Sequence, residues 1–227
     1  MQPVTMAIKG NVPIIFTVPH DGGVVSFFNE EELPIRRPER QNDEGTGYAV
    51  YQACDDMERR FKKRPFALFQ KVERKRLTRE IILSFYNRVL EDVRFCLNKW
   101  GRCYLFDFHA FQNQPEIGNY DIVLGTNHRQ TTCINFDLQF GNNLGLWVLF
   151  DNNKQRCRLK VYVPDMSPRE GERFVASKDF TLAKWMKDRE PRVNALQMEI
   201  YKDWLMMDEN TEIFIKVLSN AIALNTL

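Results

Sequence analysis

Two of the three histidines in this chain occupy similar places in the sequence, and the imidazole side chain is a common ligand for zinc. His20 follows the apolar run 13–18 after Pro19, and His109 follows the apolar run 103–108. Because ligands of open α/β sheets bind outside the carboxyl ends of the strands, two such histidines can converge on one cleft. A shared metal site is therefore one hypothesis. The alternative is that His20 is a turn residue and His109 a hydrogen-bond donor in the core.

A zinc site needs a third protein ligand, and the segment 42–46 (NDEGT) offers carboxylates just before a predicted helix. Asp43 is the better candidate. The local zinc signatures HExxH and HxxE are both absent, since position 23, three residues after His20, is a glycine. Any metal site must therefore be assembled by the fold.

Positioning these residues requires strands that alternate with helices. The run 13–18 is rich in β-branched and aromatic residues, which predicts a buried strand. The segment 79–99 has apolar residues at helical spacing, and Gly101 ends it before the second buried strand, 103–108. The predicted core face of this helix consists of Ile82, Phe85, Val89, Val93 and Cys96. The order strand, helix, strand favours an α/β sheet.

The rest of the chain continues this pattern without a linker or repeat, which indicates one domain over residues 1–227. We expect helices at 45–63 and 211–224, strands at 120–124 and 158–163, and an irregular loop with one short helix at 165–192. In the segment 195–200 apolar and polar residues alternate, which places Gln197 and Glu199 on one face.

Composition bounds the classes of function. The chain has 227 residues, 44% hydrophobic and 27% charged, with a net charge of +2, so no global field favours nucleic acid or membranes as partners. Five cysteines without a CxxC pair, no signal-peptide pattern and no long apolar run indicate a soluble, cytoplasmic protein. GxSxG, P-loop and GxGxxG motifs are absent, which argues against serine hydrolases, NTPases and dinucleotide-binding enzymes.

Five segments, in this order and spacing, resemble the N-formylglutamate amidohydrolase family and span about residues 12 to 201. They are VPHDGG at 18–23, NDEGTGY at 42–48, FDFHAF at 106–111, DIVLGTNH at 121–128 and PRVNALQMEI at 191–200. The resemblance implies a three-layer α/β fold like that of zinc carboxypeptidases, with a mixed central sheet flanked by helices. It also implies hydrolysis of the amide bond of an N-formyl or N-acyl amino acid.

The same resemblance assigns roles to single residues. His20, Asp43 and His109 look like ligands of Zn²⁺, with Glu44 as the neighbouring alternative to Asp43, and Glu199 looks like the general base. Gln197 is a candidate substrate contact, and His128 is either a hydrogen-bonding residue of its loop or a substrate contact. Asp107 is expected to point to the opposite face of its strand from His109, so it is a weaker, structural candidate.

The substrate-binding element of the family, an Arg followed by Asp-x-Asn-Arg on the strand after the first helix, falls on residues 71–81. Arg74 matches the first Arg, and Arg76 or Arg79 could substitute by a shift of register. Positions 78, 80 and 81 carry Thr, Glu and Ile in place of the Asp, Asn and Arg of the family. These departures favour an N-acyl amino acid or related carboxylate other than N-formylglutamate as the substrate.

A function of another class is also open: a catalytically silent binding protein that keeps the fold. Its basic segment 59–79 contains ten Lys or Arg residues and one acid, Glu73, and could bind an anionic partner. The simpler interpretation is a solvated surface whose charge is balanced by Asp55, Asp56 and Glu58.

Overall fold

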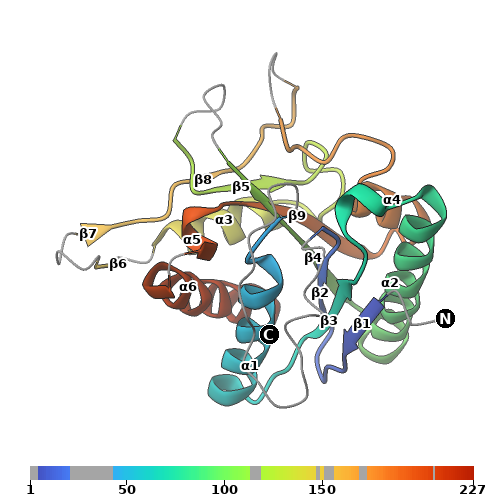
Figure 1. The fold of residues 1–227 in the computed structure, drawn as a ribbon, viewed down its shortest axis with the longest axis horizontal. Coiled ribbons are helices and arrows are strands. Elements are labelled where there is room, and N and C mark those ends of the chain that lie inside the picture. Colours follow the sequence, from blue (N-terminus) through green and yellow to red (C-terminus); the bar gives the residue numbers. More distant parts are fainter. Residues whose placement is uncertain are drawn as a thin grey trace.

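The centre of the molecule is a seven-stranded mixed β-sheet (Figure 1). The structure is a computed structural model and describes residues 5–20, 43–112, 119–146, 149–150, 156–168, 173–206 and 208–227. Residues 21–23 and Asn42, which belong to two of the motifs above, lie outside the described residues, as do residues 169–172 of the expected loop.

The elements alternate along the chain much as the sequence pattern predicts. The strands are β1 (Thr5–Ile8), β2 (Ile14–Val18), β3 (Phe66–Gln70), β4 (Cys103–Phe111), β5 (Ile122–Gly125), β6 (Leu149–Phe150), β7 (Arg156–Cys157), β8 (Val161–Tyr162) and β9 (Val193–Tyr201). The helices are α1 (Thr46–Phe61), the 3₁₀ turn η2 (Arg74–Arg76), α2 (Arg79–Trp100), α3 (Phe136–Leu146), α4 (Leu182–Arg189), α5 (Asp203–Met206) and α6 (Asp208–Thr226).

The sheet brings distant parts of the chain side by side, in the order β1-β3-β2-β4-β9-β5-β8. β3, β2, β4 and β9 run parallel, whereas β1 pairs antiparallel with β3, and β5 pairs antiparallel with β9. The carboxyl ends of β2, β4 and β9 therefore meet at one edge, as expected for a cleft in a largely parallel sheet.

Helices cover both faces of the sheet (Figure 1). On one face α1, α3 and α6 pack over buried side chains such as Phe16, Phe106 and Phe140. On the other face α2 and α4 enclose a second core around Phe85 and Trp185. This arrangement confirms the three-layer α/β fold, and β2 and β3 are fully buried because they are covered on both sides.

Several predicted elements are confirmed. α2 buries Phe85, Val89, Val93 and Cys96, and it ends at Gly101, whose φ of 71° lies in the left-handed region. The short helix α4 lies inside the expected loop. None of the helices in the described ranges combines the length and hydropathy needed to cross a lipid bilayer.

Other elements differ from expectation. β4 runs on to Phe111, so His109 lies within the strand rather than after it, because β9 pairs with β4 over its whole length. The segment 71–81 is not a strand: β3 ends at Gln70, and Thr78 caps α2 by accepting a hydrogen bond from the backbone N–H of Ile81 at 3.4 Å. β3 itself was not predicted, since its five residues are too few to distinguish a strand from other apolar runs.

Candidate metal centre

The sheet brings the two histidines of interest together. β2 and β4 are parallel neighbours, and the ring centroids of His20 and His109 lie 5.1 Å apart. Both side chains line the same cleft at the carboxyl edge of the sheet. A separation this small allows both rings to reach one ion through bonds of roughly 2 Å each.

A tight turn places Asp43 beside these histidines. The backbone N–H of Asp43 donates to the carbonyl of His20 at 3.0 Å, and the Thr46 hydroxyl donates to the carbonyl of Asp43 at 2.6 Å. Gly45, which precedes α1, has a φ of 84°, and a Cβ atom there would meet the Leu205 carbonyl oxygen at 2.6 Å. The turn therefore needs glycine for both its backbone conformation and its packing.

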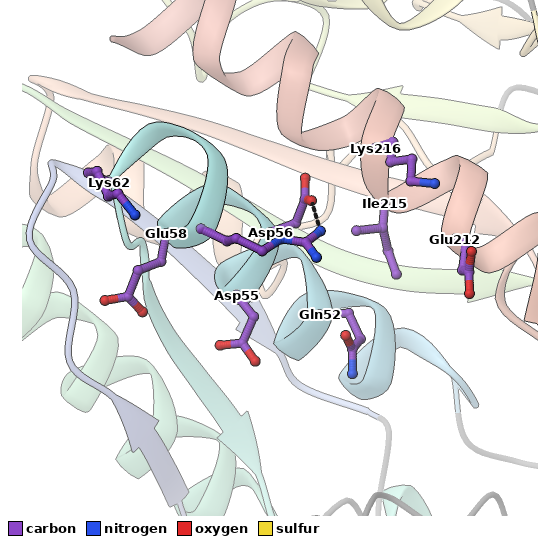
Figure 2. Close-up of a pocket in the computed structure, with 9 residues that line it drawn as sticks. Gln52, Asp55, Asp56, Glu58, Lys62, Glu212, Ile215 and Lys216 are labelled. Carbon is purple, nitrogen blue, oxygen red and sulfur yellow. Dashed lines mark hydrogen bonds and ion pairs between the residues drawn. The ribbon is translucent and has the colours of Figure 1, made fainter.

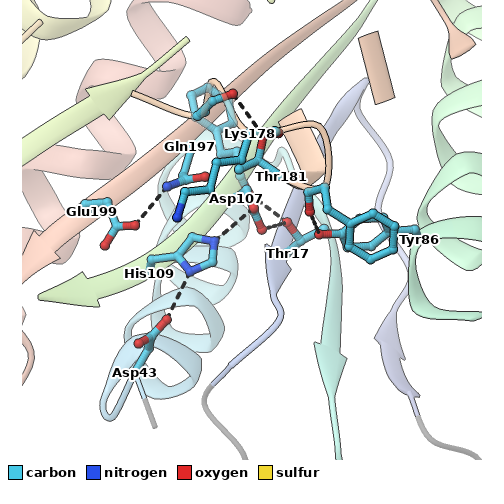
Figure 3. A network of polar contacts seen from close by, with 12 residues as sticks. Thr17, Asp43, Tyr86, Asp107, His109, Lys178, Thr181, Gln197 and Glu199 are labelled. Atoms are coloured by element: carbon cyan, nitrogen blue, oxygen red, sulfur yellow. Dashed lines mark hydrogen bonds and ion pairs between the residues drawn. The ribbon is translucent and has the colours of Figure 1, made fainter. Parts of the chain in front are cut away.

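His109 is held between two carboxylates, as Figure 3 shows. Its Nδ1 lies 3.0 Å from Asp43 Oδ2, and its Nε2 lies 3.0 Å from Asp107 Oδ2. The other oxygen of Asp107 accepts a hydrogen bond from the Thr17 hydroxyl at 2.6 Å. The expectation that Asp107 points away from His109 is wrong, because side chains two residues apart on a strand share a face.

Glu199 lines the cleft from β9, directly opposite His109 in the strand register. Gln197 lies on the same face and donates a hydrogen bond from Nε2 to Glu199 Oε1 at 2.8 Å, as the alternation in sequence predicts. Burial raises the pKa of Glu199 to about 7, against the opposing effect of the His109 charge. A carboxyl group with a pKa near neutrality can both accept and release a proton.

The remaining charges of the site depend on one another. Burial, reinforced by the charge of His109, lowers the pKa of His20 to about 4, so that its ring is neutral. Burial works against the charged form of His109, but the carboxylate of Asp107 and the hydrogen bond to Asp43 hold the pKa of His109 well above its usual range. Burial likewise opposes the charge on Asp43, yet its hydrogen bond with His109 keeps the pKa of Asp43 low.

The donor set fits a zinc ion. In the described part of the chain the buried Nδ1 of His20 has no hydrogen-bond partner, and a buried lone pair without a partner is costly unless a ligand meets it. Two imidazoles and one carboxylate are ligands that zinc prefers. Among the described residues, no three side chains are already arranged as ligands around one point. Both ring nitrogens of His109 contact carboxylates instead. Asp43 rather than Glu44 makes the contact with His109.

The cleft has a volume of about 540 Å³ and contains only some of the candidate substrate contacts. Arg74 and Gln197 line it, and Arg74 Nη1 also lies 3.1 Å from Asp43 Oδ1. Neither Arg76 nor Arg79 lines it: Arg76 pairs with Glu73, and the guanidinium of Arg79 lies over the ring of Phe180.

His128 also lies apart from the cleft lining. Its Nδ1 is 2.9 Å from the carbonyl oxygen of Asp165, and its side chain is buried in the turn after β5. This position agrees with a role in holding the loop, one of the two roles open to it.

The sequence pattern missed the opposite wall of the cleft. Residues 173–178, 180–182 and Tyr86 form it, and among them are two cations, Arg173 and Lys178. Their sequence gives no signal for this, because the segment is polar and lacks periodicity. Only the packing of the segment against α2 and the end of β5 brings it to the cleft.

A second hollow, of about 750 Å³, lies between α1 and α6 (Figure 2). It is larger than the cleft, but its lining contains no histidine and mixes acids such as Asp55 and Glu212 with bases such as Lys62 and Lys216. Its described carboxylates do not form a group that could hold a metal ion, and its charges are of both signs. The chemistry therefore points to the smaller cleft.

The basic segment 59–79 is extensively paired with acids. Arg59 and Arg60 both bind Asp56 at 2.9 Å, and Arg64 lies 2.9 Å from Glu58. Further contacts join Arg74 to Asp43, and both Lys75 and Arg76 to Glu73. These ion pairs support the interpretation of the segment as a charge-balanced surface.

Known proteins share this architecture at low sequence identity. No family model matches the sequence, and a comparison with curated proteins finds no significant match. The crystal structure of N-formylglutamate amidohydrolase from Ralstonia eutropha aligns with a TM-score of 0.58 over 97% of this chain and 96% of that one, at 12% identity. The chain has the fold of that amidohydrolase. A gene product of Agrobacterium tumefaciens aligns with a TM-score of 0.60 over 98% of this chain and 94% of that one, at 11% identity.

Proposed function

We propose that this protein is a zinc-dependent hydrolase that cleaves the amide bond of an N-formyl or N-acyl amino acid. One observation carries the proposal: His20 and His109 line the same cleft as Glu199, whose pKa is about 7, and Asp43, from a third segment, contacts His109. The fold shared with an N-formylglutamate amidohydrolase supports the same reaction class.

His20, Asp43 and His109 would hold the metal. When bound, zinc acts as a Lewis acid towards a carbonyl group and lowers the pKa of water towards 7. The neutral ring of His20 and the ionised carboxylate of Asp43 are already in the protonation states that a metal requires. His109 must give up its proton, and Asp107 then orients the ring through Nε2.

Glu199 would perform the proton transfers. As the base it takes a proton from the attacking water, and as the acid it returns this proton to the nitrogen of the leaving amine. Gln197 fixes the carboxyl group through its hydrogen bond to Oε1, which keeps the acceptor at one position in the cleft. The Glu199 residue is only 5% exposed, which limits the access of bulk water to its carboxyl group.

Metal analysis of the full chain, purified without chelator, tests the ligand set. We expect about one equivalent of zinc in the wild type and less than about a tenth of an equivalent in His20→Ala and His109→Ala. His128→Ala is the matched control, because the third histidine lies outside the cleft lining and should leave the zinc content unchanged. Zinc-free wild type, or zinc retained in both ligand variants, would contradict the metal site.

Turnover of a panel of N-formyl and N-acetyl amino acids tests the reaction. Glu199→Gln should keep its zinc and lose rate by a factor of about 10² or more, the usual size of a general acid–base contribution. An unaltered rate in this variant would remove Glu199 from the chemistry. No turnover of any panel member by the zinc-loaded wild type would instead favour a binding protein that keeps the fold.

A further inference from the structure

The wall of the cleft opposite Glu199 contains a cation that the proposed chemistry does not use. We propose that Lys178 is the specificity-determining residue of this cleft and selects substrates that carry a free carboxylate. The proposal rests on the proposed function for its substrate class, but binding measurements test it independently of turnover.

The ammonium group of Lys178 is not engaged by any residue in the described part of the chain. Its side chain is exposed, lines the cleft, and makes no hydrogen bond or ion pair with a described residue. In Figure 3 the side chain extends towards the wall that holds Gln197 and His109. An ammonium group with three unused donors at the mouth of a cleft suits an anion brought by the substrate.

The arginines of the cleft are differently placed. Arg74 lies 3.1 Å from Asp43, a proposed metal ligand, so its guanidinium already has an anionic partner. Arg173 also lines the cleft and has contacts of its own. Of these three cations of the cleft, Lys178 is thus the one that can bind a substrate carboxylate without first giving up a contact with another described residue.

The backbone around Lys178 is held in place, so the ammonium is presented to the cleft rather than carried by a loose loop. The Thr181 hydroxyl lies 2.9 Å from the carbonyl oxygens of both Ala176 and Lys178. The backbone N–H of Thr181 donates to the same carbonyl oxygen of Lys178 at 3.0 Å. On the far side, the Tyr86 hydroxyl donates to the carbonyl of Phe180 at 2.9 Å.

The segment is also anchored at its beginning. The backbone N–H of Asn127 donates to the Val175 carbonyl at 2.6 Å, which ties the segment to the turn after β5. Ala176 has a φ of 57°, a left-handed conformation that a non-glycine residue adopts only when its surroundings impose it. Contacts from α2 and from the β5 turn therefore fix the residues on both sides of Lys178.

A pair of probes that differ in one charge tests the proposal. N-formyl-L-methionine carries a free carboxylate, and its N-methylamide does not. We expect calorimetric titration of the full chain to show that the acid binds roughly tenfold or more tightly than the amide, as for a charge-assisted hydrogen bond. Lys178→Met should abolish that preference by weakening the acid alone, and Lys178→Arg should restore most of it.

The control is Lys216→Met, which removes an exposed lysine from α6 in the second hollow and should leave both affinities unchanged. If a panel substrate is turned over, Lys178→Met should raise its KM about tenfold while kcat stays within about twofold, because a contact that is equally strong in the ground state and the transition state acts on binding alone. Equal binding of acid and amide by the wild type, absence of acid binding, or an unchanged preference in Lys178→Met would overturn the assignment. A preference that depends on Lys178 without any turnover would leave the assignment intact and count only against the proposed hydrolysis.

Discussion

Asp107 Oδ2 lies 3.0 Å from Nε2 of His109, two residues further along β4, and this contact leaves Nδ1 of the same ring to face Asp43. The orientation of the imidazole is therefore decided by a carboxylate on its own strand. Carboxylates that hold a histidine in this way orient the ring and raise its basicity as a metal ligand.

Asp107→Asn should weaken zinc binding about 10- to 100-fold, the range typical of a lost partner behind a metal ligand. Competition with a chromophoric chelator measures this directly. Glu91→Gln, on the exposed face of α2, removes one carboxylate far from the site and should leave the affinity unchanged. Equal zinc affinity in Asp107→Asn and the wild type would mean that Asp107 has no part in the metal site.

Thr17→Val should lower the free energy of unfolding by about 1–3 kcal/mol, because the buried Asp107 oxygen loses its hydroxyl donor while the shape is kept. Urea denaturation of the chelator-treated protein measures the loss. Thr226→Val is the control, since the one described partner of its hydroxyl is the carbonyl of Ile222 within α6. There we expect a change of less than about 1 kcal/mol. Similar losses in both variants would argue against a special role for the Thr17 contact.

Glu199→Gln should stabilise the metal-free protein at neutral pH. With a pKa of about 7 when folded and an ordinary value of 4.5, Glu199 keeps a proton in the folded state that the unfolded chain releases. Stability of the wild type therefore falls as the pH rises from about 4.5 to 7, by up to about 3 kcal/mol, and Gln lacks this penalty. Urea titrations at pH 4.5 and 8 should show a higher free energy of unfolding for Glu199→Gln than for the wild type only at pH 8.

The control for this pH effect is Glu212→Gln, on the exposed face of α6, which also removes one carboxylate. Its stability relative to the wild type should differ little between the two pH values. A stability difference between Glu199→Gln and the wild type that is the same at both pH values would show that Glu199 is not desolvated in the folded protein.

Gly45→Ala should destabilise the protein more than Gly101→Ala. Both glycines have positive φ, 84° and 71°, so each alanine incurs a cost of roughly 1–2 kcal/mol for the left-handed conformation. Only Gly45 also meets a backbone atom, the Leu205 carbonyl oxygen at 2.6 Å, whereas a Cβ at Gly101 meets nothing within 4 Å. Thermal unfolding compares the two, and equal losses would show that the turn before α1 can shift away from α5.

Much of the fold could be predicted because the spacing of apolar residues within one helix or strand depends only on neighbouring residues in the sequence. The apolar spacing of α2 and the alternation of Gln197 and Glu199 on β9 each follow from the geometry of one element. The extension of β4 through His109 could not be predicted, since it depends on pairing with β9, which lies far away in the sequence. The face of Asp107 was within reach of the same alternation rule and was misjudged.

The sequence by itself determined which side chains are available for metal chemistry: two histidines after apolar runs, an acid before a helix and a glutamate on an alternating strand. It also determined the alternation of strands and helices, since both rest on short-range periodicity. Only the tertiary structure decided that Asp107 supports His109, that Arg76 and Arg79 lie away from the cleft, and that Lys178 stands at its mouth. Such relationships arise from contacts between segments far apart in the chain, and no local pattern of residues encodes the direction in which a loop packs.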